Sequence, residues 1–245
     1  MKALAHKLVE ELTVETAFTI DGKIQIAESV VITWVVMAII TFLCIWLTRN
    51  MKVRNPGKRQ LAAEFIVNWL DSFTGDMLGE HALQYREYMS TVLLFIGFAN
   101  IIGVFGVKPP TKDMNVTIAL SLMSIILIEA AGIRAKGGKG WLRSFTEPIA
   151  IVTPINILEV FIRPLSLCMR LFGNVLGAFV IMELIKMLVP VGLPVVFSLY
   201  FDFFDGLIQA YVFVFLTSLF IAEAAEPAAP RPKKVRKAKR KAVQA

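Results

Sequence analysis

Long runs of apolar residues, separated by short polar segments, give this chain five stretches that are each long enough to cross a bilayer. The stretches are 30–48, 89–107, 116–133, 148–188 and 195–222. A transmembrane helix needs about 20 predominantly apolar residues, so the pattern predicts an all-α polytopic membrane protein with about five membrane-spanning helices. The fourth stretch is far longer than one ordinary span, so we expect it to tilt or bend, with Pro154 and Pro164 interrupting it.

Residues 60–80 show a different pattern, in which apolar side chains recur at helical spacing with polar ones between them. The apolar residues are Leu61, Phe65, Ile66, Trp69 and Phe73. The polar residues are Glu64, Asn68 and Asp71. This arrangement is typical of an amphipathic helix that lies along the membrane interface instead of crossing it.

The composition supports the membrane assignment and narrows the meaning of the charge. The chain has 245 residues, of which 56% are hydrophobic, and its mean hydropathy is +0.66; these values exclude an ordinary soluble domain. The net charge of +7 arises in the tail 231–245, which holds eight Lys/Arg and no acid. The remainder is nearly neutral, so the charge does not indicate a nucleic-acid partner. Cys44 and Cys168 lie in separate apolar stretches and form no metal-binding pattern.

The distribution of positive charge predicts the orientation of the chain. The loops 49–59 and 134–143 carry five and four Lys/Arg, whereas the turns 108–115 and 190–194 carry two and none. Cytoplasmic loops are enriched in Lys and Arg, and with five spans the basic loops and the tail fall on one side. The N-terminus is therefore expected outside and the C-terminus in the cytoplasm.

These patterns divide the chain into three parts. Residues 1–29 are expected to form an extracytoplasmic N-terminal segment, 30–226 a membrane domain, and 227–245 a basic, disordered cytoplasmic tail. The tail is interpreted mainly as solvated and orientation-fixing, with contact to anionic lipid or RNA as alternatives.

Several ionisable and amide side chains interrupt the apolar stretches. They are Glu129, Glu159, Arg163, Arg170, Asn174, Glu183, Lys186, Asp202, Asp205 and Gln209. Such groups are rare inside membranes and commonly mark ion pathways. Some have a simpler structural explanation, because Glu159 and Arg163 are spaced as a helical ion pair and Lys186 lies near a span end, from where it can reach the interface.

Arg170 has no such explanation. Its helical neighbours three and four residues away are Ser166, Leu167, Gly173 and Asn174, and none of them is an acid. A charged Arg at the bilayer centre costs at least about 2.5–3.5 kcal/mol. Because no local acid neutralises it, Arg170 needs a distant carboxylate, water or another subunit, and this indicates a functional role.

The last stretch carries a second group of polar residues. Asp202, Asp205 and Gln209 are spaced three and four apart, which places them on one face of an α-helix. A stripe of two acids and an amide in an apolar-aromatic context suggests a hydrated path, although the acids could also simply lie near the outer interface.

The segment RPLSLCMRLFGNVLGA around Arg170 resembles the signature helix of subunit a of F-type ATP synthases, in which a Pro precedes an SL-x-x-R-L-F-G-N run. The family's last helix carries a Gln in an apolar-aromatic context, which IQAYVFVFLT matches at Gln209. The resemblance extends over residues 30–222. It implies that Arg170 is the essential stator arginine and that Asn174 and Gln209 are its polar companions.

Two positions depart from the family pattern. Many bacterial members carry an acid nine residues after the arginine and mitochondrial members a His, whereas this chain has Phe179 there. Glu183, one turn further on, is a candidate substitute. Members often have His or Glu seven residues before the Gln, where this chain has Asp202.

The resemblance implies a mechanism in which a ring of small subunits carries one carboxylate each past Arg170, which separates two aqueous half-channels. Protons or Na⁺ would enter along Asp202, Asp205 and Glu183, and leave along a path that includes Glu159. The chain itself would not be an enzyme and would need no cofactor. Its implied partners are c-ring proteolipid subunits, subunit b of the peripheral stalk, the soluble catalytic ATPase head and membrane lipid, in a bacterial cell (inner) membrane.

Two other interpretations fit the same residues less well. A self-contained secondary transporter could use Arg170 to bind an anionic substrate, but the chain shows no internal repeat. A non-transporting scaffold would leave Arg170 and the acidic stripe unexplained. Neither the coupling ion nor the ring size follows from the residues.

Overall fold

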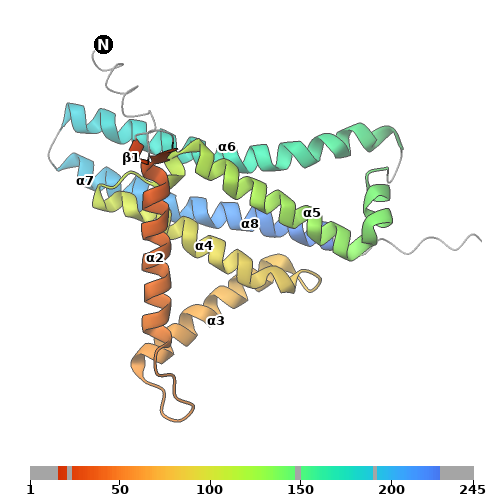
Figure 1. The fold of residues 1–245 in the computed structure, drawn as a ribbon, viewed down its shortest axis with the longest axis horizontal. Coiled ribbons are helices and arrows are strands. Elements are labelled where there is room, and N and C mark those ends of the chain that lie inside the picture. The colour runs from red at the N-terminus through yellow and green to blue at the C-terminus, as the bar shows by residue number, and fades with distance from the viewer. Residues whose placement is uncertain (1–15, 21–23, 147–149, 190–191, 227–245) are drawn as a thin grey trace, which may run out of the picture.

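Helices dominate the computed structural model, which describes residues 16–20, 24–146, 150–189 and 192–226 (Figure 1). Five helical segments are long and apolar enough to cross a membrane, namely Glu28–Thr48, Leu83–Phe105, Met114–Ser144, Thr153–Leu188 and Pro194–Ala225. The prediction of an all-α polytopic membrane protein with about five spanning helices is therefore confirmed.

The elements follow one another with short connections. In chain order they are β1 (Thr16–Ile20), β2 (Ile24–Ala27), α2 (Glu28–Thr48), α3 (Lys58–Leu78), η1 (Leu83–Tyr85), α4 (Arg86–Ile101), η2 (Ile102–Phe105), η3 (Pro110–Lys112), α5 (Met114–Ser144), η4 (Ala150–Val152), α6 (Thr153–Leu188), α7 (Leu193–Ser198), η5 (Leu199–Asp205) and α8 (Gly206–Ala225). Most of these are α-helices or 3₁₀ turns, and η5 is a π-helix.

A small antiparallel hairpin, β1 with β2, precedes the first spanning helix and was not predicted from the sequence. Its strands, TAFTI and IQIA, are rich in the β-branched residues that favour strands. The hairpin falls within the segment predicted as extracytoplasmic, of which residues 1–15 lie outside the described residues. The predicted tail 227–245 also lies outside them.

The spanning helices do not share one direction. Figure 1 shows α2 running steeply across the direction of α5, α6 and α8. At a rise of about 1.5 Å per residue, the 21 residues of α2 extend about 31 Å, which matches a hydrocarbon core of about 30 Å. The 36 residues of α6 extend about 54 Å, so this helix fits the same layer only with a strong tilt.

The core lies where α4, α5, α6 and α8 pack together. Its fully or nearly fully buried residues include Met89, Ile96, Ile128, Leu171, Phe213, Val214 and Ile221. Small hydroxyl residues also lie in this interior and bond to carbonyls of their own helix, as Ser124 Oγ does to Leu120 O (3.0 Å) and Thr217 Oγ1 to Phe213 O (2.8 Å). Small side chains of this kind let membrane helices approach closely.

One prediction about a loop was wrong. Residues 134–143 were expected to form a basic loop, but helix α5 includes them and ends at Ser144, with a break at Gly137 where φ is +71°. A residue without Cβ takes this left-handed conformation at no steric cost. The Trp141 indole then donates to Glu129 Oε2 (2.7 Å), and this bond holds the segment after the break against the helix before it.

Helix α3 forms where the amphipathic pattern predicted it, and it is not among the segments apolar enough to span. Leu61, Phe65, Ile66 and Trp69 are exposed in the isolated chain. Phe73 stacks on Trp69 of the same helix at a centroid distance of 5.2 Å, and a tilted contact of its ring with Tyr211 at 5.5 Å attaches α3 to α8. Its exposed apolar residues fit the predicted interfacial location, which stays a prediction.

Candidate functional site

Arg170 lies six residues after Pro164 on α6 and is half-buried. Within the described part of the chain, its guanidinium has no hydrogen bond or ion pair. Gly173 and Gly177, one and two turns further along α6, have no atom within 4 Å of the position a Cβ would take. The helix therefore presents Arg170 beside an open face of small residues, and any carboxylate that pairs with it must come from outside the described chain.

One turn after Arg170, Asn174 connects α6 to the last spanning segment. Its Nδ2 donates to Gln209 Oε1 at 2.6 Å, although the two residues are 35 positions apart. Gln209 is 2% exposed. The two amides predicted to accompany Arg170 are thus brought into direct contact, while the buried Gln209 Nε2 has no hydrogen-bond partner among the described residues.

A second buried amide, Asn100 on α4, fixes the start of α8. Asn100 Nδ2 donates to Gly206 O (3.0 Å), and Thr111 Oγ1 donates to Asn100 Oδ1 (2.7 Å). A Cβ at Gly206 would lie 2.8 Å from Asn100 Cβ, which is closer than side-chain atoms tolerate. Sequence analysis missed Asn100, although an amide inside an apolar span was a signal that could have identified it.

The two acids of the last span lie in an unusual segment. Residues Leu199–Asp205 form a π-helix between α7 and α8, a geometry that is rare and frequently found at functional sites. Ser198 Oγ donates to Asp202 Oδ2 at 2.6 Å, and the other carboxylate oxygen lies against Gly103. Asp205 has no hydrogen bond or ion pair to any residue that the structure describes.

All three residues of the predicted stripe border one small cavity of about 30 Å³. This small cavity is lined by Asn100, Pro109, Val175, Ala178, Phe179, Phe201, Asp202, Asp205, Gly206 and Gln209. It lies between α6 and the last spanning segment, and most of its wall is apolar.

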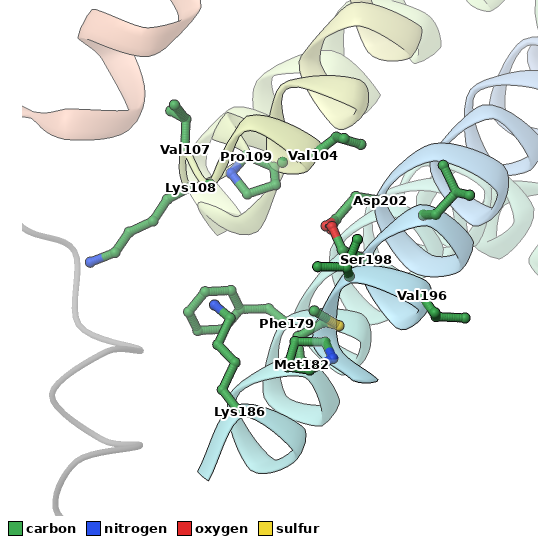
Figure 2. Close-up of a pocket in the computed structure, with 15 residues that line it drawn as sticks. Val104, Val107, Lys108, Pro109, Phe179, Met182, Lys186, Val196, Ser198 and Asp202 are labelled. Carbon is green, nitrogen blue, oxygen red and sulfur yellow. The ribbon is translucent and has the colours of Figure 1, made fainter. Parts of the chain in front are cut away.

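A larger opening of about 440 Å³ adjoins the small cavity, and we call it the outer mouth after the side on which the orientation predicted from loop charge would place it (Figure 2). Phe179, Pro109 and Asp202 line both spaces. Figure 2 shows Val104, Val107, Lys108 and Pro109 on one side and Phe179, Met182 and Lys186 of α6 on another, with Ser198 and Asp202 from the last segment.

Phe179, the departure from the family pattern, lies under a cation. Lys112 Nζ is 3.5 Å from the centroid of the Phe179 ring, a geometry in which the ring face attracts the ammonium. Glu183 is occupied by Lys186, whose Nζ is 2.7 Å from Glu183 Oε1. Lys186 lines the outer mouth, whereas Glu183 does not border either space.

At the other end of α6, Glu159 and Arg163 form the ion pair that their spacing predicted, at 2.9 Å. Arg163 also contacts Glu223 of α8 at 3.1 Å. Sequence analysis did not single out Glu223, because its partner is 60 residues away and only its position at the end of the last span could have drawn attention to it.

These residues border a third space of about 360 Å³, which we call the Glu223 cavity. Its wall contains four acids, Glu129, Glu159, Glu223 and Glu226, and two bases, Lys136 and Arg163. The outer mouth is formed by the C-terminal end of α6 and the Glu223 cavity by the N-terminal end. Arg170 lies between them along the helix.

The fold and these sites define a polytopic membrane protein with an unpaired arginine between two openings. The family model described as "ATP synthase A chain" matches residues 30–222. The chain belongs to this family, the ion-translocating, non-catalytic membrane subunit of F-type ATP synthases. The resemblance inferred from the sequence is therefore confirmed, and ATP synthesis and ion transport are the processes the chain serves.

Three relatives illustrate the match. The chain is 34% identical over 209 residues to "ATP synthase subunit a, sodium ion specific" of Propionigenium modestum, covering 79% of this chain and 72% of that protein. It is 34% identical over 204 residues to "ATP synthase subunit a 2" of Bradyrhizobium sp. (strain BTAi1), covering 83% and 91%. It is 32% identical over 202 residues to "ATP synthase subunit a" of Moorella thermoacetica, covering 82% and 92%.

Proposed function

We propose that Arg170 is the electrostatic barrier between two aqueous half-channels, through which protons or Na⁺ pass to and from a rotating ring of carboxylate-bearing subunits. The observation that carries the proposal is a half-buried arginine with no partner in the described chain, on an open face of α6 between two cavities. A ring carboxylate supplies the missing partner. The guanidinium keeps its charge throughout the cycle, because Arg is not deprotonated in proteins.

The outer half-channel begins at the outer mouth. Asp202 borders both the mouth and the small cavity, so it takes up the ion at their junction. Asp205 and Gln209 continue the path, and Asn174 brings it to α6 through its bond to Gln209. Glu183 has an accessory role through its ion pair with Lys186, which lines the mouth.

The inner half-channel ends at the Glu223 cavity. Glu159 and Glu223 share one guanidinium, that of Arg163, so this group of three carries a net negative charge. Negative charge in a water-accessible cavity attracts cations. The ion released from the ring leaves toward the cytoplasm along this wall.

The same proposal assigns partners and location. The open face of α6 receives the c-ring proteolipid subunits, and the membrane sector connects through subunit b of the peripheral stalk to the soluble catalytic head. Residues 30–226 form the ion-translocating domain in a bacterial cell membrane, surrounded by lipid. Residues 1–29 lie outside and the basic tail 227–245 lies in the cytoplasm, as the charge of the loops indicates.

The test is ATP-driven ion uptake into inverted vesicles that contain the whole complex with Arg170→Ala. Uptake should be abolished while the complex still assembles. The matched control is Arg134→Ala, which removes an exposed arginine of α5 and should pump at the native rate. Repeating the assay with varied Na⁺ identifies the coupling ion.

The secondary-transporter interpretation predicts a different result. A self-contained transporter that uses Arg170 to bind an anionic substrate would purify as a lone chain or homo-oligomer, without ring or head. Near-native pumping by Arg170→Ala would show that the stator mechanism proposed here is wrong.

A further inference from the structure

We propose that the small cavity holds one ordered water molecule that joins Gln209 to Asp205. Both side chains border this cavity, and they are four residues apart on consecutive turns. The cavity thus places a hydrogen-bond donor and an acceptor, neither of which has a partner among the described residues, on the same wall.

The donor is Gln209 Nε2. The carboxamide is 2% exposed, and its oxygen already accepts from Asn174 Nδ2 at 2.6 Å. This bond leaves the other end of the carboxamide, Nε2 in this structure, without a partner among the described residues, so the NH₂ group needs another acceptor. A buried N–H without one costs about 1–3 kcal/mol, and the great majority of buried polar groups are satisfied by protein or by ordered water.

The other polar groups of the wall are already engaged. Asn100 uses its Nδ2 on Gly206 O and its Oδ1 on Thr111. Asp202 accepts from Ser198. The Asp205 carboxylate is the acidic group of this wall that has no hydrogen bond or ion pair among the described residues, and a water that accepts from Gln209 and donates to Asp205 satisfies both groups.

The size of the cavity limits its content to about one molecule. Its volume is about 30 Å³. A water needs about 10–15 Å³ of such space, and buried waters typically make about three hydrogen bonds. Besides Gln209 and Asp205, the second oxygen of Asp202 is the third candidate partner.

The consequence for transport rests on the function proposed above. With the water in place, an unbroken series of hydrogen bonds leads from Asp205 through the water to Gln209 and on to Asn174, one turn from Arg170. Without it, the series ends at an unpaired amide. The water is therefore a required part of the outer half-channel.

The first experiment is a structure of the intact complex at a resolution that shows ordered waters. The map should contain a peak within hydrogen-bond distance of both Gln209 Nε2 and Asp205. Continuous side-chain density with no peak, or a direct bond between the two side chains, would overturn the proposal.

The second experiment fills the cavity. Ala178→Val adds two methyl groups to its wall from α6, and should remove the peak and slow ATP-driven pumping roughly fivefold or more. The control is Ala38→Val, the same change at an exposed position of α2 that borders none of the three cavities, which should pump at the native rate. If Ala178→Val does not assemble, Val175→Ile adds one methyl group to the same wall.

The outcomes distinguish a failure of the water proposal from a failure of the proposed stator function. Native pumping by an assembled, cavity-filling variant that has lost the peak would refute the role of the water, while loss of pumping in Arg170→Ala would still support the stator function. Native pumping by Arg170→Ala would refute the stator function, and the peak in the map would then decide the water site alone.

Discussion

Adding one methyl group at Gly206 should strongly destabilise the protein, because this residue brings the start of α8 against α4. A Cβ at this residue would lie 2.8 Å from Asn100 Cβ. The same approach allows the Asn100 Nδ2 bond to Gly206 O at 3.0 Å. We predict that Gly206→Ala forces α8 away from α4 and breaks this bond, directly between Asp205 and Gln209.

The magnitude follows from three contributions. Overpacking a close helix contact costs about 1–3 kcal/mol, and leaving the Asn100 amide unpaired costs about 1–3 kcal/mol. Replacing Gly by Ala in a helix returns about 1 kcal/mol. The net destabilisation is therefore about 1–5 kcal/mol, and the displaced Gln209 should lose its contact with Asn174.

The assay combines thermal stability of the purified complex in mild detergent with ATP-driven pumping in vesicles. Gly206→Ala should lower both. Gly97→Ala is the matched control, since it lies across the same helix pair and its added Cβ would meet only Leu207 Cδ2 at an ordinary 3.8 Å. Equal stability and pumping of the two variants would refute the reasoning.

Two further substitutions test the proposed outer and inner half-channels. Asn174→Leu removes the donor to Gln209, so it should reduce pumping at least about tenfold by leaving the buried amide oxygen unpaired, with the assembled complex confirmed by co-purification of the ring. Glu223→Gln leaves Arg163 paired with Glu159, so stability should change by no more than about 1 kcal/mol. Its effect should appear as slower ion exit at the cytoplasmic side, and an unchanged pumping rate would exclude Glu223 from the inner path.

Some features were readable from the sequence because they depend on local geometry. The number of spans follows from the length of apolar runs, and all five were confirmed. The pairing of Glu159 with Arg163 follows from helical spacing. The isolation of Arg170 follows in the same way, because no residue within one turn carries an acid.

Local geometry was also misleading in places. The glycines and lysines of residues 134–143 resembled a loop, but only Gly137 departs from helical geometry, and it forms a kink between two helical pieces of α5. The hairpin before α2 lay in a segment too mixed to predict. The stripe on the last span was placed on one face by assuming an α-helix, whereas Asp202 and Asp205 lie in a π-helix and Gln209 in the α-helix that follows.

The polar contacts that make the site could not be found without the tertiary structure, because their partners are far apart in the chain. Asn174 and Gln209 are 35 residues apart, Asn100 and Gly206 are 106 apart, and Arg163 and Glu223 are 60 apart. The sequence by itself determined the membrane class, the spans and the solitary arginine. Which of these distant polar groups meet depends on how tilted helices cross, and that is decided by close packing at Gly103 and Gly206, where a side chain would hold the helices apart.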